Sequence, residues 1–211
     1  AVSTPLVCLG LSMQTWDISD TSWGWITLGA TIGYVLFAQF ISNRETVAYL
    51  SPTLHLVSAM LLTYAFFLFF TGDSLVFVIA GEALVLHILA KRVSDKMIGF
   101  SAHALSALSA LWLLPRLLIE DVQGTSVFNE QALTDLWVMA VFIAVAVTQL
   151  KESEKLKSIY LFFTHLALLA WLYREFVPFA NGQGIVTITW GVYGAGLLIF
   201  ALQKNIDQLR T

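Results

Sequence analysis

Seven stretches of the sequence are apolar, almost free of charge and long enough, or nearly so, to cross a hydrocarbon core that takes about 20 helical residues. They lie at about 24–42, 48–70, 74–90, 98–118, 133–150, 158–173 and 184–203. Backbone groups find no water inside a bilayer, and these stretches do not alternate in polarity as the strands of a barrel would. The sequence therefore predicts an all-α fold, a polytopic transmembrane helical bundle with about seven membrane-spanning helices.

Composition agrees with this class. Hydrophobic residues make up 58% of the 211 residues and charged residues only 12%, whereas about a quarter of a soluble domain is charged. The net charge of -3 does not suit a nucleic-acid partner, which a basic patch would indicate. The single cysteine, Cys8, cannot form an internal disulfide or a CxxC metal site and is interpreted as an ordinary apolar residue.

The charged loops divide into a basic set and an acidic set. Nine of the eleven Lys and Arg residues fall in loops on one side, and only Arg116 and Arg174 fall in the opposite loops, which also hold most of the acids. Under the positive-inside rule the basic side faces the cytoplasm. We therefore expect a multi-pass protein of the cell inner membrane whose cytoplasmic loops are Arg44, Lys91–Lys96, Lys151–Lys157 and Lys204–Arg210.

The chain also repeats itself as a single transmembrane domain over 1–211. Each unit is an apolar helix, a short basic turn such as "LHILAKRVSDKMIGF", and a returning apolar helix. The predicted units are an N-terminal stub with an outer loop (1–23), three hairpins (24–70, 74–118 and 133–173) and half of a fourth hairpin (184–211). Because the fourth unit has no returning helix, we expect a piece of a longer polytopic protein.

Histidines recur at one position in the returning helices. "TLHLVSAML", "SAHALSALS" and "FTHLALLAW" place His55, His103 and His165 seven or eight residues past the turn, on the order of 10 Å inside at the helical rise. His87 lies near the same depth. These imidazoles could bind metal or haem, or could be hydrogen-bonding residues inherited from one ancestral repeat. No HExxH, ExxH or Ser/His/Asp pattern accompanies them, so we expect no metal and no cofactor.

Glu82, in "GEALVLHILAKR", is the strongest candidate for a functional residue. A charged carboxylate at the centre of a bilayer costs at least about 2.5–3.5 kcal/mol, so we expect Glu82 to be buried among helices and to carry a proton or find a partner. It could also be a neutral packing residue. His87 follows five residues later, about 140° around the helix. The two side chains should therefore serve different neighbours of a centrally placed helix.

The pattern resembles the bacterial membrane proteins grouped as domain of unknown function 2339, over about residues 70–211. In that family a Trp or Glu begins a helix, a basic pair follows two to four turns later, and another helix returns. "TWGVYGAGLLIFALQKNIDQLR" has this form from Trp190 to Arg210, and "GEALVLHILAKR" has a shorter version of it. The resemblance implies a multi-helix membrane architecture and supplies no catalytic residue.

Small residues predict close helix packing in three places. They are Gly29 with Gly33, then Gly191 with Gly194 and Gly196, and then Ala102, Ser106 and Ala110 on one face. The loop between about 115 and 137 is the longest, and it is either a solvated connector or a binding loop.

Three functions remain open from the sequence. The first is a transporter or permease in which Glu82 and the four histidines line a polar path. The second is a non-catalytic membrane scaffold or assembly subunit, and the third is a membrane enzyme acting on lipid-linked substrates. Expected partners are the lipid bilayer and other helices of a longer chain or of other membrane subunits.

Overall fold

The structure, a computed structural model, describes residues 3–44, 46–93, 95–120, 127, 129–148 and 153–204. Over these residues it is helical and contains no strand. Seven helices are long and apolar enough to cross a membrane, and a shorter helix precedes them. Their bounds are α1 Ser3–Thr15, α2 Asp20–Ser42, η1 Ala48–Leu50, α3 Ser51–Phe69, α4 Gly72–Val93, α5 Lys96–Leu118, α6 Glu130–Thr148, α7 Glu154–Phe176 and α8 Gly182–Lys204.

The helices match the apolar stretches and extend a few residues beyond most of them, because polar residues cap their first turns. Asp95 accepts a hydrogen bond from the backbone N–H of Met97 at 2.7 Å, which begins α5 at Lys96. Ser19 caps α2 in the same way. α2 begins at Asp20, four residues before the apolar stretch that the sequence places at about 24–42, and the division of the chain into a stub and hairpins stays a prediction. The expected N-terminal stub is the helix α1.

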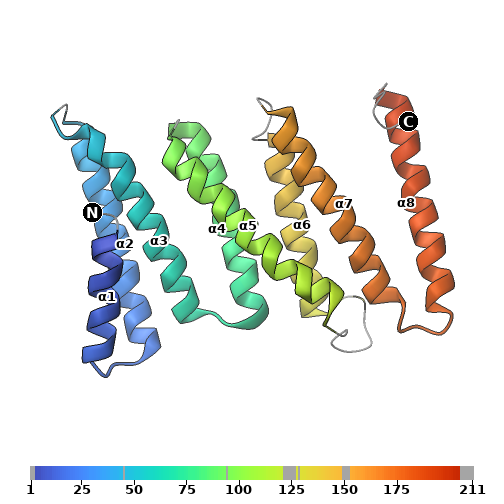
Figure 1. Cartoon of the computed structure of the whole chain (residues 1–211), viewed down its shortest axis with the longest axis horizontal. Coiled ribbons are helices and arrows are strands. Elements are labelled where there is room, and N and C mark those ends of the chain that lie inside the picture. The colour runs from blue at the N-terminus through green and yellow to red at the C-terminus, as the bar shows by residue number, and fades with distance from the viewer. Residues whose placement is uncertain are drawn as a thin grey trace.

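The helices stand in a row, with consecutive helices running in opposite directions (Figure 1). The closest pairs are α2 with α3, α4 with α5, and α6 with α7. Further contacts join α4 to α6, α3 to α5 and α5 to α7, while α8 packs against α7 at one end of the row. This arrangement makes α4 and α5 the central pair, so side chains on α4 can meet neighbours on both sides.

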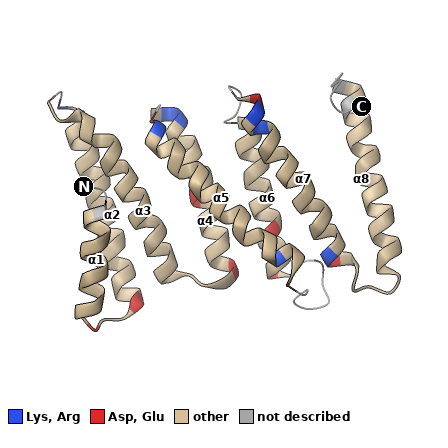
Figure 2. Cartoon of the chain, viewed as in Figure 1, with Lys and Arg blue, Asp and Glu red and all other residues tan. Residues whose placement is uncertain are grey.

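Most of the charged residues lie at the upper and lower ends of the helices (Figure 2). The basic turns between α4 and α5 and between α6 and α7 lie at the same end, and Arg116 and Arg174 lie in the last turns of helices that end at the other. Of the predicted basic positions, Lys151 and Arg210 lie outside the described residues, as does most of the long loop (121–126 and 128). Where the ends are placed relative to a membrane remains a prediction.

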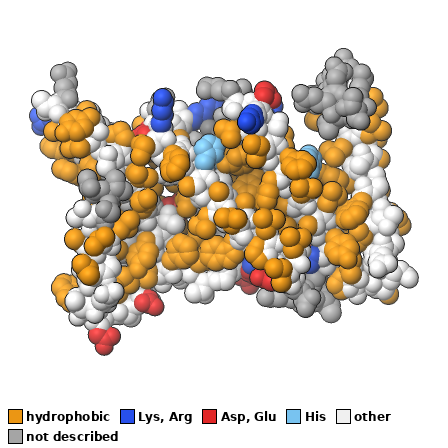
Figure 3. All heavy atoms as spheres, viewed as in Figure 1, with side chains coloured by type: hydrophobic (Ala, Val, Ile, Leu, Met, Phe, Trp, Pro, Cys, Tyr) orange, Lys and Arg blue, Asp and Glu red, His pale blue; other side chains and the backbone are white. Residues whose placement is uncertain are grey.

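The surface between these ends is largely apolar (Figure 3). On α8, Ile188 and Val192 are both 68% exposed. Such side chains would be costly in water over so wide an area, and they suit contact with lipid. The observed helices thus fit a multi-pass membrane protein.

Small residues pack closely in only one of the three predicted places. Ala102 and Ser106 are buried, as expected. A Cβ added at Gly29, Gly33, Gly191, Gly194 or Gly196 would meet no neighbour within 4 Å, so the expectation of close packing at these glycines is wrong. Gly182 does need to be glycine, because a Cβ there would lie 2.3 Å from the carbonyl oxygen of Phe176.

Candidate functional site

Glu82 lies at the middle of α4, ten residues after Gly72 and eleven before Val93, which is about 15 Å from either end at the helical rise. It is 5% exposed, so the expectation that it is buried among helices is confirmed. Its side-chain partner is Thr63 on α3, whose Oγ1 lies 3.1 Å from both carboxyl oxygens. No other side chain in the described part of the protein bonds to this carboxyl group.

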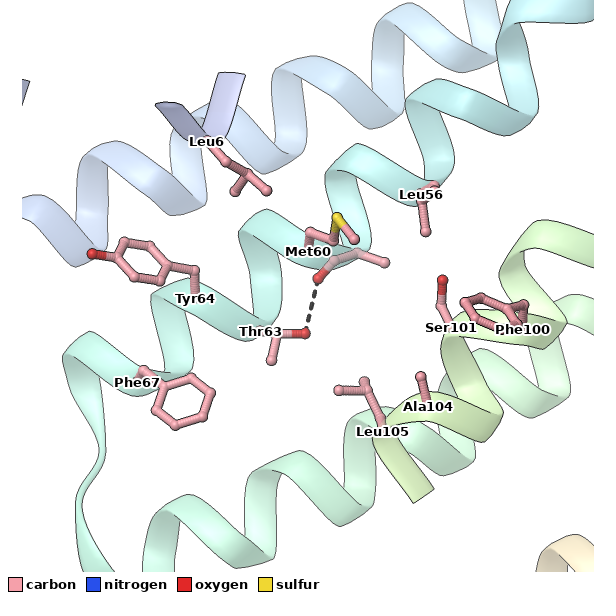
Figure 4. A pocket seen from close by; sticks show the side chains of 11 residues that line it. Leu6, Leu56, Met60, Thr63, Tyr64, Phe67, Phe100, Ser101, Ala104 and Leu105 are labelled. Carbon is pink, nitrogen blue, oxygen red and sulfur yellow. Dashed lines mark hydrogen bonds between the residues drawn. The ribbon is translucent and has the colours of Figure 1, made fainter. Parts of the chain in front are cut away.

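The hydroxyl group of Thr63 has too few hydrogen atoms to donate to all its neighbours, and this favours a neutral, protonated carboxyl group at Glu82. Thr63 Oγ1 also lies 3.0 Å from the carbonyl oxygen of Ala59, one turn earlier in α3 (Figure 4). A hydroxyl group has one hydrogen to donate. If that hydrogen is donated to Ala59, the hydrogen between Thr63 and Glu82 must come from the carboxyl group. A carboxylate could be paired only at the expense of the bond to Ala59.

Thr63 is also one of the residues that line a cavity of about 360 Å³ (Figure 4). Its walls are side chains of α1, α3 and α5, and nearly all of them are apolar. The side-chain oxygens on it belong to Thr63, Ser101 and Tyr64, and the Tyr64 hydroxyl is held 3.0 Å from the sulfur of Met13. Glu82 is therefore separated from this cavity by a single threonine.

His87, also buried, faces a different neighbour, as the helical spacing predicts. Its Nε2 lies 3.2 Å from Oγ of Ser106 on α5. Ser106 donates its own hydrogen to the carbonyl oxygen of Ala102 at 2.9 Å, so Nε2 of His87 carries the hydrogen of this bond. The two polar residues of α4 thus serve α3 and α5 separately.

His103 on α5 lies beside His87, with 4.7 Å between the ring centroids. Its Nδ1 is 2.9 Å from the hydroxyl oxygen of Tyr160 on α7. A second cavity, of about 280 Å³, is lined by His103, Ser106 and Tyr160 together with apolar residues of α5, α6 and α7. The structure therefore brings two of the four histidines together, and one of them, His103, lines a cavity.

The other two histidines stand apart. His165 on α7 bonds to the hydroxyl of Tyr193 on α8, and the side chain of His55 on α3 has no hydrogen-bond partner within the described ranges. Counted from the first helical residue, His55 is seven residues after Ala48, His103 seven after Lys96 and His165 eleven after Glu154. His165 thus lies about one helical turn further from its helix start than His55 and His103 do. That the three histidines occupy equivalent positions in a repeat stays a prediction.

A buried group of charges near the opposite end of α5 was missed by the sequence reasoning. Arg116 of α5 is 5% exposed, and its guanidinium pairs with Asp73 of α4 and with Asp135 of α6, the latter at 2.8 Å. Asp135 is fully buried and also lies 2.8 Å from Arg174 of α7. The four helices α4 to α7 are thus joined by one charged network.

Arg174 completes this network. Its guanidinium donates to Glu175 at 3.0 and 2.6 Å and to the backbone carbonyl of Arg116 at 3.0 Å. Two carboxylate oxygens remain without a hydrogen bond, Oδ2 of Asp135, which is within ion-pair distance of Arg174, and Oε2 of Glu175. Three carboxylates therefore face two guanidinium groups.

The sequence analysis placed Arg116 and Arg174, with most of the acids, in loops on one side, and the structure corrects this, because Arg116, Asp135 and Arg174 are buried within helices. Arg116, Asp135 and Arg174 fall at the ends of apolar stretches, where charge is ordinarily solvated. Only the packing of four helix ends against one another removes them from solvent. The only feature of the sequence that could have indicated this burial is their position in the last or first two turns of long helices.

The described residues contain no group of three or more His, Cys, Asp or Glu side chains placed to hold a metal ion. The arrangement instead offers a buried carboxyl group, a chain of hydroxyl and imidazole groups, and a closed ion network. No protein-family model, no curated protein and no solved structure matches the chain.

Proposed function

We propose that the chain is a multi-pass membrane protein that transports protons, alone or with a polar solute, and that Glu82 takes up and releases the proton. One observation carries this proposal: a carboxyl group with 5% exposure lies at the middle of a candidate membrane span and has one side-chain partner. Intramembrane carboxyl groups are costly, and where they persist they commonly serve proton relays.

The surroundings of Glu82 support a path in both directions. Asp73 stands nine residues earlier on α4 in the ion network, and His87 stands five residues later next to Ser106. Thr63, which bonds to Glu82, also lines the 360 Å³ cavity, so a change of the Thr63 rotamer would give the carboxyl group a route toward that space. Glu82 therefore has polar groups on the same helix on each side of it and an exit toward α3.

The test is proton flux into liposomes that contain the purified protein, driven by a potassium diffusion potential and followed with an enclosed pH-sensitive dye. The wild type should carry protons, and Glu82→Gln should lower the rate at least tenfold, because the amide cannot exchange a proton. Glu82→Asp should keep part of the rate.

A matched control is Glu130→Gln, which makes the same change at an exposed carboxylate at the start of α6. It should leave the flux unchanged. Equal rates for wild type and Glu82→Gln, with both proteins folded, would rule out the proposed role of Glu82.

A scaffold role is the second candidate, and the ion network favours it. Arg116, Asp135 and Arg174 tie α5, α6 and α7 together near one end of the helices, which is what a fixed assembly platform needs. A scaffold predicts an absence of flux and unchanged behaviour of Glu82→Gln. The same liposome experiment therefore separates the two functions.

The proposal also places the basic turns in the cytoplasm, following the positive-inside rule. The test uses single cysteines in a Cys8→Ala background, at Lys96 on the basic end and at Ile119 on the other, both exposed. An impermeant thiol reagent added to whole cells should label Ile119→Cys and spare Lys96→Cys. The reverse pattern would invert the topology.

The likeness to domain of unknown function 2339 stays a prediction and assigns no role to any residue here.

A further inference from the structure

We propose that the 280 Å³ cavity between α5, α6 and α7 binds the ring of a membrane-dissolved quinone. The inference is independent of proton transport through Glu82, since Glu82 does not line this cavity. It depends on the size of the cavity, on its aromatic wall and on the pair formed by His103 and Tyr160.

The cavity suits one substituted ring. Its volume is close to the lower end of the range for small-molecule pockets, roughly 300 Å³. Phe142 meets Tyr160 edge to face at 5.6 Å between centroids and meets Phe163 at 5.4 Å. Aromatic rings in this arrangement form a stiff apolar wall against which a further ring can pack.

His103 and Tyr160 supply the polar contact. A neutral imidazole and a phenol have one N–H and one O–H between them, and the bond from Nδ1 to the hydroxyl uses only one of these hydrogens. If Tyr160 donates, His103 keeps an N–H for a ligand; if His103 donates, its second nitrogen accepts. The pair can therefore bond to the carbonyl oxygen of a quinone and equally to the hydroxyl of the reduced quinol.

Other ligand classes fit less well. Among the residues that the structure describes, no Lys, Arg, Asp or Glu lines the cavity, so an anionic or cationic ligand would enter without a counter-charge from them. A lipid tail would leave the remaining polar hydrogen of the His103–Tyr160 pair without an acceptor. Ala107, on the rim, is exposed, and histidine side chains are visible within the apolar surface in Figure 3, so a molecule dissolved in the bilayer has a lateral way in.

The experiment is titration calorimetry of the detergent-solubilised protein with decylubiquinone, compared with decylbenzene, which has the same tail and no ring oxygens. Wild-type protein should bind the quinone saturably and should bind decylbenzene at least tenfold more weakly. Tyr160→Phe keeps the ring and removes the hydroxyl, and it should weaken quinone binding about tenfold. Ala110→Trp should abolish binding by filling the cavity.

Tyr193→Phe is the matched control, because it removes the hydroxyl of the other histidine–tyrosine pair, between α7 and α8, and should leave the affinity unchanged. The proposal is overturned if wild-type protein does not bind the quinone, if decylbenzene binds as tightly, or if Tyr160→Phe binds as the wild type does. Tyr160→Phe is nearly isosteric, so this outcome can be read even where Ala110→Trp fails to fold.

Discussion

Two acidic residues of α4, Asp73 and Glu82, differ in how many partners bond to their carboxyl groups. At the first turn Asp73 joins a network in which Arg116 and Arg174 pair with carboxylates from three helices. In the middle of the same helix Glu82 has one threonine as its side-chain partner. The network is held by several charged contacts, whereas the carboxyl group depends on one neutral hydrogen bond.

The difference indicates two purposes. A buried charge with several partners fixes how helices pack. Removing one partner leaves the other charges buried without compensation, which costs a large desolvation free energy. A buried carboxyl group with one weak partner can change its protonation state without breaking the packing around it. We therefore expect substitutions in the network to cost stability, and substitutions at Glu82 to cost function.

The largest effect is expected for Arg116→Gln. The change leaves Asp135, which is fully buried, with Arg174 alone, and leaves Asp73 without its pair. Breaking a buried pair by removing one partner typically costs about 3–5 kcal/mol in the free energy of unfolding. Reversible unfolding by sodium dodecyl sulfate in mixed micelles, followed by circular dichroism, measures it.

The double variant Arg116→Met with Asp135→Leu provides the control, because it removes the charge of Arg116 and of its fully buried partner at once. It should recover the part of the lost stability that comes from leaving Asp135 unpaired with Arg116, since replacing a buried pair with apolar groups is often close to neutral, while Asp73 stays without its partner in both variants. If Arg116→Gln alone costs less than about 1 kcal/mol, as an exposed pair would, the network is not a structural element.

The sequence predicted the helices well because their signal is local. Length and apolar composition alone place every span, and the caps shift the ends by only a few residues. It also separated Glu82 from His87, since a five-residue step sets the angle between them. Contacts between distant helices carry no such local signal, so the sequence could not predict that Asp135 pairs with Arg116 and Arg174.

The same reasoning explains the mixed result for the histidines. His87 and His103 lie on the two helices of one predicted hairpin, so their proximity could have been anticipated from the turn between them. The tyrosines that bond to His103 and His165 come from α7 and α8. Nothing in the spacing of those tyrosines distinguishes them from lipid-facing aromatic residues.

The second prediction concerns the weakly held side of the comparison. Thr63→Val removes the side-chain partner of Glu82 without changing the shape of the residue, and it leaves a buried polar group unsatisfied. That should cost about 1–3 kcal/mol in the free energy of unfolding. Combining it with Glu82→Leu should be closer to neutral, because both polar partners are then absent. A cost of less than about 0.5 kcal/mol for Thr63→Val would mean that Glu82 has another partner.

The third prediction is the direct contrast with Arg116. Glu82→Gln keeps a hydrogen-bonding group of the same size next to Thr63, so its unfolding free energy should stay within about 1 kcal/mol of the wild type. Proton flux in liposomes should nevertheless fall at least tenfold. A loss of stability as large as that of Arg116→Gln would place Glu82 in the same class as the network and remove the distinction.

The smallest effect is expected at Lys157, which pairs with Glu154 at 3.6 Å on the exposed surface of α7. The two side chains are 37% and 79% exposed, so water already satisfies most of each charge. Lys157→Gln should lower the unfolding free energy by no more than about 0.5 kcal/mol, the usual value for an exposed pair on a helix. Salt sharpens the contrast further. Because exposed charges are screened over about 8 Å at physiological ionic strength, the effect of Lys157→Gln should vanish in concentrated salt, whereas the cost of Arg116→Gln should persist. If the stability costs of Lys157→Gln and of Arg116→Gln fall together as salt is added, water reaches the network around Arg116. The buried network and the exposed pair on α7 then differ only in degree.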